Sequence, residues 1–133
     1  LCAEGESSIE DVIFERRFGC AAGFERLGAK VQVNGRTLCI RPVGVLRGTE
    51  LAAPDLRGGA ALVVAALAAS GTSVIEHPEH IDRGYAAFTE ILASLGAQIR
   101  RDAPLRNTSA KKTSSKKQNH LAIGTKRWYD TVI

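Results

Sequence analysis

The hydrophobic and polar positions of the first hundred residues follow strand-like and helix-like spacings in turn. Strands are expected at SSIEDVIFE (7–15), AKVQV (29–33), RTLCIRP (36–42), VLRGTELAA (45–53) and GTSVIE (71–76). One short helix is expected to open at RRFG (16–19) and close on Gly28. A later helix is expected to open at DRGY (82–85) and close on Gly96, before a final strand at AQIRR (97–101). The predicted order β-α-β-β-β-α-β-α-β is that of a layered α/β (α+β) fold.

The central predicted helix lies in residues 55–71, DLRGGAALVVAALAASG. It is apolar nearly all round from Ala60 to Ala69, which is typical of a buried helix, and Asp55 is a good N-cap. The last helix has one apolar face instead, formed at helical spacing by Phe88, Ile91, Leu92 and Leu95. We expect that face to pack against the rest of the fold.

The tripeptide Leu-Gly-Ala occurs twice along the chain. Leu27-Gly28-Ala29 and Leu95-Gly96-Ala97 stand 68 positions apart, and each ends a predicted helix just before a strand. An internal structural repeat is therefore predicted.

The positive charge of the chain is confined to its C-terminal part. Up to Arg101 there are 11 Lys and Arg against 12 Asp and Glu, a net charge of −1, whereas residues 102–133 hold 7 against 2, a net charge of +5. That stretch is rich in Ser, Thr and Lys and lacks an apolar period over most of its length. We predict a folded unit over 1–101 and a basic, disordered tail over 102–133. Nucleic acid is not expected as a partner of the folded unit.

Composition narrows the class of protein further. With 133 residues, 44% hydrophobic and 24% charged, the chain suits one globular domain, and its longest apolar run is too short for a membrane span. No secretory signal is visible at the N-terminus, and the three cysteines, Cys2, Cys20 and Cys39, form no CxxC pair. These features favour a reduced, cytoplasmic setting. His77 and His80 are interpreted as a solvated turn, so no metal site is predicted.

Each predicted helix carries arginine near its start. Arg17 follows Arg16 and precedes Phe-Gly, Arg57 precedes Gly-Gly, and Arg83 precedes Gly-Tyr. A guanidinium beside glycine and the exposed N–H groups of a helix N-terminus makes an anion site, because arginine binds carboxylate and phosphate oxygens bidentately. For any single arginine, a solvated or locally paired side chain is the commoner role. Asp55 and Asp82 are likewise expected to be helix caps first and acid–base groups second.

The motifs IFERRFG, LGAKVQV, APDLRGGAALVVAALAASGTSVIE and HIDRGYAAFTEILASLGAQIRR closely resemble the C-terminal part of the UDP-N-acetylglucosamine 1-carboxyvinyltransferase family. The resemblance spans about Ser8 to Arg101. It implies part of an inside-out α/β repeat domain, with helices packed inside sheets. It also implies transfer of the enolpyruvyl group of phosphoenolpyruvate to the 3′-hydroxyl of UDP-N-acetylglucosamine, a step of peptidoglycan synthesis, with release of phosphate and no metal or organic cofactor.

The resemblance also implies roles for single residues. Arg17 and Arg57 would hold the substrate-derived carboxylate, Arg83 would neutralise the departing phosphate, and Asp55 would orient groups beside the reacting centre. Ile13 and Phe14 would contact the UDP-sugar. None of the three cysteines lies in a sequence like the family's reactive loop, so none is assigned as a reactive thiol.

Several motifs of the family have no match in this chain, including its N-terminal lysine and asparagine and its proposed general base. The chain resembles about the last third of such an enzyme, and we expect it to be inactive without the missing N-terminal part. Three alternatives stay open: a shikimate-pathway enolpyruvyl transferase, one half of a split enzyme, and a non-catalytic module whose basic tail binds nucleic acid or a protein.

Overall fold

The computed structural model describes residues 1–14, 16–102 and 120–125, as two sheets with four helices. The strands are β1 (Ser7–Glu10), β2 (Lys30–Asn34), β3 (Thr37–Arg41), β4 (Glu50–Ala52), β5 (Gly71–Glu76), β6 (Gln98–Asp102) and β7 (His120–Thr125). The helices are α1 (Ala21–Arg26), α2 (Leu56–Leu67), α3 (Glu79–Asp82) and α4 (Phe88–Ser94). The mixed α/β class expected from the sequence is confirmed, and no helix within these residues is long and apolar enough to cross a membrane.

The first sheet has three antiparallel strands in the order β1-β3-β2. Its β2–β3 hairpin turns at Gly35 and Arg36, between the paired residues Asn34 and Thr37. Gly35 has φ +59, a left-handed conformation that glycine adopts without steric cost. Both strands of this hairpin were expected from the sequence to within a residue or two at each end.

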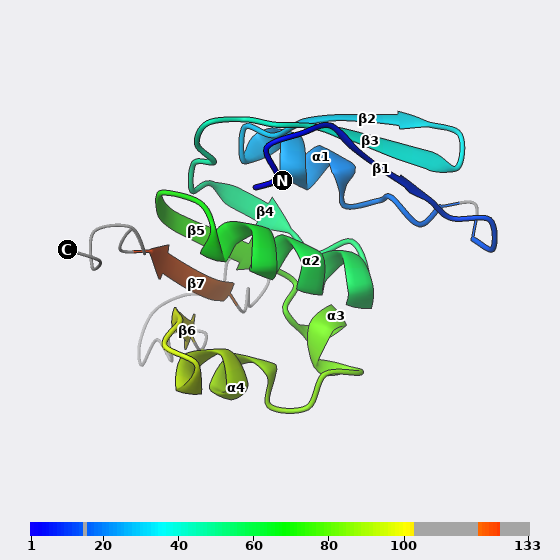
Figure 1. Ribbon diagram of the computed structural model, residues 1–133. Helices are drawn as coiled ribbons and strands as arrows, with labels where there is room; N and C mark the ends of the chain where they lie inside the picture. Colours follow the sequence, from blue (N-terminus) through cyan, green and yellow to red (C-terminus); the bar gives the residue numbers. More distant parts are fainter. Residues whose placement is uncertain (15, 103–119, 126–133) are drawn as a thin grey trace, which may run out of the picture.

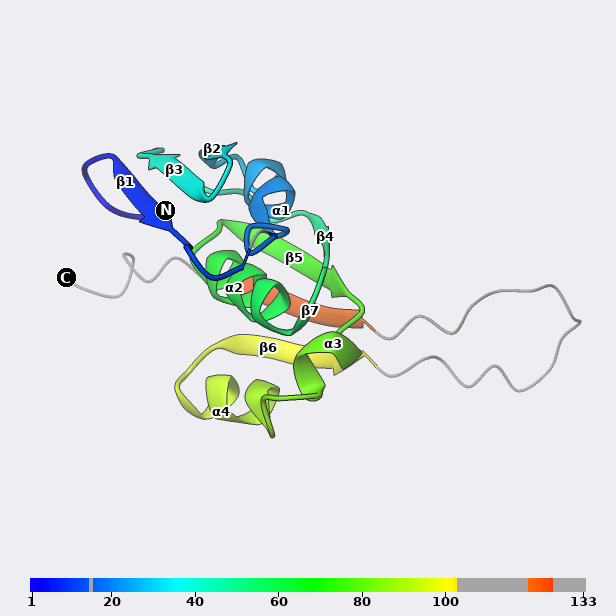
Figure 2. The same ribbon diagram turned by 90° about the vertical axis from the view of Figure 1, so that its right-hand side faces the viewer.

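The second sheet has four strands in the order β4-β5-β7-β6. β4 runs parallel to β5, and β7 pairs antiparallel with both β5 and β6. α1 lies between the two sheets, where it contacts β2 on one side and β4 and α2 on the other (Figure 1). α2 packs on β5 and β7, and α4 packs on β6 (Figure 2).

The core extends from α2 and the second sheet to α1 and β3 of the first sheet. Its largest fully buried side chains include Leu27, Leu62, Val63, Ile75, Ile81, Leu121 and Ile123. α1 crosses α2 closely at Gly23, where a Cβ atom would come 2.5 Å from Cδ2 of Leu62. The alanine-rich α2 is buried along most of its length, as its sequence predicts, although Val64 faces solvent.

The two Leu-Gly-Ala tripeptides end their helices with the same hydrogen bonds. Gly28 and Gly96 have φ +91 and +95, and the alanine that follows each glycine donates to a carbonyl five residues back, that of Phe24 and that of Leu92. This is the Schellman ending, which satisfies carbonyls in the last helical turn. Each helix then leads into a strand, β2 or β6, so both copies of the expected repeat have the same local structure.

The two copies differ in burial. Leu27 is fully buried, whereas Leu95 is 70% exposed and Ile91 is 53% exposed. The apolar face expected for the last helix is therefore only half covered, because Phe88 and Leu92 pack against the core and the other two side chains do not.

The basic tail contains a strand that was not expected. Residues 120–125 form β7 in the interior of the second sheet, and Leu121, Ala122 and Ile123 are buried. The prediction of disorder is wrong for these six residues. The apolar segment LAI lies between two strands, where it gains backbone hydrogen bonds to both and contacts with the core. The polar residues on either side of it in the sequence gave no sign of this strand. Residues 103–119 and 126–133 of the tail lie outside the described residues.

The structure also differs from expectation around the first helix and in the last predicted helix. The predicted strand over 7–15 ends at Glu10, because Asp11 begins a tight turn, and α1 starts only at Ala21. The helix expected to open at 82–85 is instead two helices, α3 and α4, separated by a loop in which Ala87 has φ +52.

Candidate functional site

A pocket of about 500 Å³ lies where the loop between β1 and α1 meets the N-terminal turn of α2. Its lining consists of Ile13, Phe14, Arg16, Arg17, Asp55, Leu56 and Arg57. The loop and α2 approach each other beside Gly19, where a Cβ atom would lie 3.8 Å from Cβ of Pro54. Five of the six residues predicted to form a site are thus brought together, although they come from two segments about 40 positions apart.

Asp55 caps α2, as its position in the sequence predicts. Its backbone is extended, and its Oδ1 accepts a hydrogen bond of 2.7 Å from the backbone N–H of Gly58. Glycine at position 58 lets the helix start lie close to Pro54, because a Cβ atom there would come 2.8 Å from Cγ of Pro54 and displace it. The positive end of the helix dipole therefore faces the pocket, and the capping carboxylate lies beside it.

Arg57 adds a full positive charge to this helix end. Its side chain is exposed, and among the described residues none accepts a hydrogen bond from it or forms an ion pair with it. A cation at a helix N-terminus is electrostatically unfavourable, and the cost is lowered when an anion occupies the same place. The position of Arg57 is therefore suited to binding a negatively charged ligand at the start of α2.

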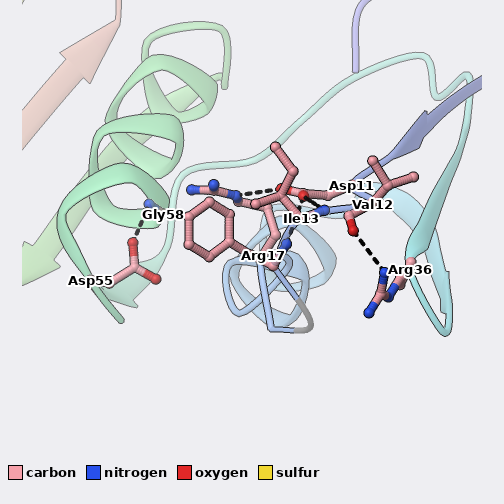
Figure 3. Close-up of polar contacts among 8 residues, drawn as sticks. Asp11, Val12, Ile13, Arg17, Arg36, Asp55 and Gly58 are labelled. Carbon is pink, nitrogen blue, oxygen red and sulfur yellow. Dashed lines mark hydrogen bonds and ion pairs between the residues drawn. The ribbon is translucent and has the colours of Figure 1, made fainter.

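The other side of the pocket is organised by Asp11, which lies at the end of β1. Its Oδ1 accepts hydrogen bonds of 2.9 Å from the backbone N–H groups of Ile13 and Phe14, and its Oδ2 accepts one of 2.6 Å from Nε of Arg17 (Figure 3). The N–H of Phe14, then the guanidinium of Arg17 and the N–H of Ile13, lower the pKa of Asp11 to about 2. The Arg17 guanidinium also lies over the Phe14 ring, 4.2 Å from its centroid.

The charges that line the pocket are predominantly positive. Arg16, Arg17 and Arg57 contribute three guanidinium groups against the single carboxylate of Asp55. Guanidinium forks and the N–H groups of a helix N-terminus bind carboxylates and phosphates, and Ile13, Phe14 and Leu56 supply an apolar rim. Such a pocket can hold a small ligand that combines an anionic group with an apolar or planar part.

Arg83 does not lie in this pocket. It was expected in the first turn of a helix, but it is the C-cap of α3 and its side chain is exposed. The expectation failed because Asp82, the supposed cap, ends α3 and binds Arg101 on β6 instead. The next residue, Gly84, packs closely on Leu56, so the backbone at 83–84 borders the helix end that forms one wall.

Three residues of the site were missed as candidates. Arg16 and Leu56 line the pocket, and Asp11 holds its loop without lining it. An aspartate that ends a strand and precedes an apolar pair is typical of a turn in which the carboxylate binds the next backbone N–H groups, so the signal for Asp11 was present. Arg16 stands in the Arg16-Arg17 pair expected at a helix start, but only Arg17 was predicted to bind the ligand.

None of the described histidines and cysteines lines the pocket. Among the described residues, no three His, Cys, Asp or Glu side chains are grouped so that they could hold a metal ion. His80 contacts the backbone carbonyl of Ala53 and His77 contacts Glu79. Cys20 is buried, and that burial raises the pKa of its thiol, which favours the unreactive protonated form.

Comparison with known proteins gives a consistent set of relatives. The family described as EPSP synthase (3-phosphoshikimate 1-carboxyvinyltransferase) matches residues 1–92. A UDP-N-acetylglucosamine 1-carboxyvinyltransferase 2 of Caldanaerobacter subterraneus subsp. tengcongensis is 48% identical over 97 residues, which are 73% of this chain and 23% of the relative. The UDP-N-acetylglucosamine 1-carboxyvinyltransferase of Anaeromyxobacter sp. (strain Fw109-5) is 47% identical over 103 residues, 77% of this chain and 24% of the relative.

A solved structure agrees with these matches. The enolpyruvyl transferase NikO from Streptomyces tendae is 38% identical and superimposes with a TM-score of 0.65 over 71% of this chain and 22% of its own. The chain thus spans about a quarter of the length of the relatives that it matches. From the family match and these relatives together, the chain belongs to the EPSP synthase family of enolpyruvyl transferases.

Proposed function

We propose that this chain supplies one wall of the active site of an enolpyruvyl transferase that uses phosphoenolpyruvate and UDP-N-acetylglucosamine, in the cytoplasmic synthesis of peptidoglycan precursors. The observation that carries the proposal is the pocket in which Arg17 and Arg57, from separate segments, face one space beside a capped helix N-terminus. Relatives that are 47% and 48% identical are named for this activity.

The proposed chemistry needs the features that the pocket offers. The 3′-hydroxyl oxygen of the sugar gives up its proton and bonds to the central carbon of phosphoenolpyruvate, while the methylene carbon gains a proton and the double bond becomes single. Loss of a proton from that carbon and cleavage of the bond between the central carbon and the phosphate oxygen then restore the double bond and release inorganic phosphate. Carboxylate, phosphate and diphosphate are close together in the addition intermediate, so fixed cations are the main stabilising device. Arg17 and Arg57 would hold the carboxylate, and Asp55 would orient groups beside the reacting carbon.

The apolar rim would take the acceptor. Ile13 and Phe14 are 76% and 53% exposed, although both are hydrophobic, and such exposure is typical of ligand-contacting side chains at a pocket edge. The proposed role of Arg83 in neutralising phosphate requires its side chain to reach the pocket from the end of α3. No metal or organic cofactor is proposed.

We further propose that the chain is inactive without the remainder that its relatives possess. An active site bounded by this chain alone would admit water, and the family's proposed general base has no match in this chain. Phosphate release from phosphoenolpyruvate with UDP-N-acetylglucosamine should therefore be undetectable for the chain alone. It should appear when a matching N-terminal part from a relative is added, whereas release by the chain alone would contradict this part of the proposal.

Binding to the chain itself tests the substrate assignment. Titration followed by nuclear magnetic resonance should show saturable shifts at the Ile13, Phe14 and Arg57 amides with phosphoenolpyruvate and UDP-N-acetylglucosamine together. The description of the matching family names 3-phosphoshikimate 1-carboxyvinyltransferase, so shikimate 3-phosphate is the second candidate acceptor. Preferential binding of that compound would favour the shikimate branch, and shifts only with duplex DNA, lost at high salt, would favour a binding module.

A further inference from the structure

One carboxylate outside the pocket holds three residues that line it. Asp11 accepts hydrogen bonds from the backbone N–H groups of Ile13 and Phe14 and from Nε of Arg17, at 2.9, 2.9 and 2.6 Å. Asp11 is itself absent from the pocket lining. Its contacts therefore act on the site through other residues.

The bond to Nε determines which edge of Arg17 remains for a ligand. A guanidinium can receive a carboxylate on the side formed by Nε and one terminal nitrogen, or on the end formed by both terminal nitrogens. Asp11 occupies Nε, and in Figure 3 the terminal nitrogens of Arg17 point towards the N-terminal turn of α2, where Asp55 and Gly58 lie. The end of the fork is thus directed into the pocket.

Asp11 is fixed in turn by the hairpin of the first sheet. Its backbone N–H donates to the carbonyl of Arg36 at 2.9 Å, and the Arg36 guanidinium donates to the carbonyl of Val12 at 2.7 Å (Figure 3). Arg36 stands at the β2–β3 turn, next to Thr37, which pairs with Glu10. The carboxylate is consequently attached to the sheet on one side and holds the pocket loop on the other.

We propose that Asp11 is a positioning residue, which aligns the end of the Arg17 guanidinium with the anionic group of the ligand; the ligand's identity rests on the proposed function. The direction in which anion affinity changes when Asp11 loses its charge separates this positioning role from a purely electrostatic one. A negative charge near an anion site weakens anion binding, so its removal should tighten binding if Asp11 acts only through its charge. Loss of alignment should weaken binding instead.

The test compares Asp11→Asn with Glu10→Gln in the full chain. Both variants remove one negative charge, but Glu10 is an exposed neighbour outside the pocket lining. The dissociation constant of phosphoenolpyruvate, measured calorimetrically with UDP-N-acetylglucosamine present, should rise about tenfold for Asp11→Asn and stay within twofold for Glu10→Gln. Asp11→Glu should recover part of the affinity. Equal or tighter binding by a folded Asp11→Asn variant would overturn the proposal.

A second measurement works without any ligand. Hydrogen exchange at Arg17 Nε–H should become at least tenfold faster in Asp11→Asn, whereas the Ile13 and Phe14 amides should stay protected, because an asparagine carbonyl still accepts their bonds. All three should exchange faster in Asp11→Ala. Unchanged exchange at Arg17 would refute the positioning role. Failure of the unaltered chain to bind either substrate, with these exchange changes present, would refute the proposed function alone.

Discussion

Arg101 donates two hydrogen bonds of 2.7 Å to Asp82, one to each carboxylate oxygen, and so ties the end of α3 to β6. This bidentate pair explains why Asp82 does not cap a helix, and it leaves Arg83 at a helix C-terminus. The guanidinium of Arg101 lowers the pKa of Asp82 below its ordinary value of 3.8.

The Asp82–Arg101 pair should add a small amount to the free energy of unfolding, and that contribution should depend on pH. Because the pKa is lowered in the folded chain, the stabilisation is complete well above pH 3.8 and is lost as the pH falls through the folded value. Both side chains are about 40% exposed, so Asp82→Asn should cost at most about 1 kcal/mol at pH 7. Urea unfolding from pH 7 to pH 2 should show that difference shrinking towards acid; a constant difference would contradict the assignment.

Gly59→Ala should destabilise the fold. A Cβ atom at position 59 would come 2.8 Å from both Cβ of Ala53 and Cγ1 of Ile81, where α2 packs against the residue that follows β4 and against α3. The overpacking cost of about 1–3 kcal/mol exceeds the gain of about 1 kcal/mol in helix propensity. Gly5→Ala is the matched control, because nothing lies within 4 Å of its Cβ position. Equal urea midpoints for the two variants would show that α2 has more room than the structure gives it.

Ile123→Ala tests the unexpected strand β7. Ile123 is fully buried between β5 and β6, so truncation should cost about 2–5 kcal/mol. Val33→Ala, at an exposed strand position, should cost far less. The free energy of unfolding of both variants, compared with the unaltered chain, decides the point. An Ile123→Ala variant as stable as the Val33→Ala control would mean that β7 does not contribute to the core.

Asp55 variants separate capping from ligand chemistry. Asp55→Ala removes the acceptor for the Gly58 N–H and should cost about 1 kcal/mol, whereas Asp55→Asn keeps a capping oxygen and should unfold close to the unaltered chain. If Asp55 also orients groups in the pocket, the affinity for phosphoenolpyruvate should change in both variants. Thermal unfolding measures the capping role, and calorimetry measures the affinity for phosphoenolpyruvate. If the affinity falls only in Asp55→Ala, the variant that is also less stable, Asp55 acts as a helix cap and not on the ligand.

The sequence predicts the local features best. Asp55 followed by Leu-Arg-Gly-Gly indicates where α2 starts, and the two Leu-Gly-Ala tripeptides indicate where α1 and α4 end. Such signals can be found in the sequence because capping and left-handed glycine depend on neighbouring residues only. Features that depend on distant partners were missed. Arg101 decides what Asp82 does, and β5 and β6 decide that 120–125 is a strand.

The same division holds for the pocket. Ile13, Phe14, Arg17, Asp55 and Arg57 were singled out from motifs and resemblance, and the structure brings them together. Arg83 was grouped with them through the HIDRGY motif and an expected helix start; it is instead the C-cap of α3 and does not line this pocket. Asp11 was missed because its importance lies in three hydrogen bonds to its neighbours rather than in a contact with the pocket.

The central claim is that Arg57 helps bind an anion at the start of α2. The most direct measurement is the affinity of the full chain for phosphoenolpyruvate, with UDP-N-acetylglucosamine present, for Arg57→Gln against Arg26→Gln. Arg26 is an exposed arginine in the last turn of α1 and is no part of the pocket lining, so its variant controls for net charge. Arg57→Gln should weaken binding about tenfold or more, equivalent to about 1.4 kcal/mol, while Arg26→Gln should stay within twofold. Equal affinities for the two folded variants would contradict the account.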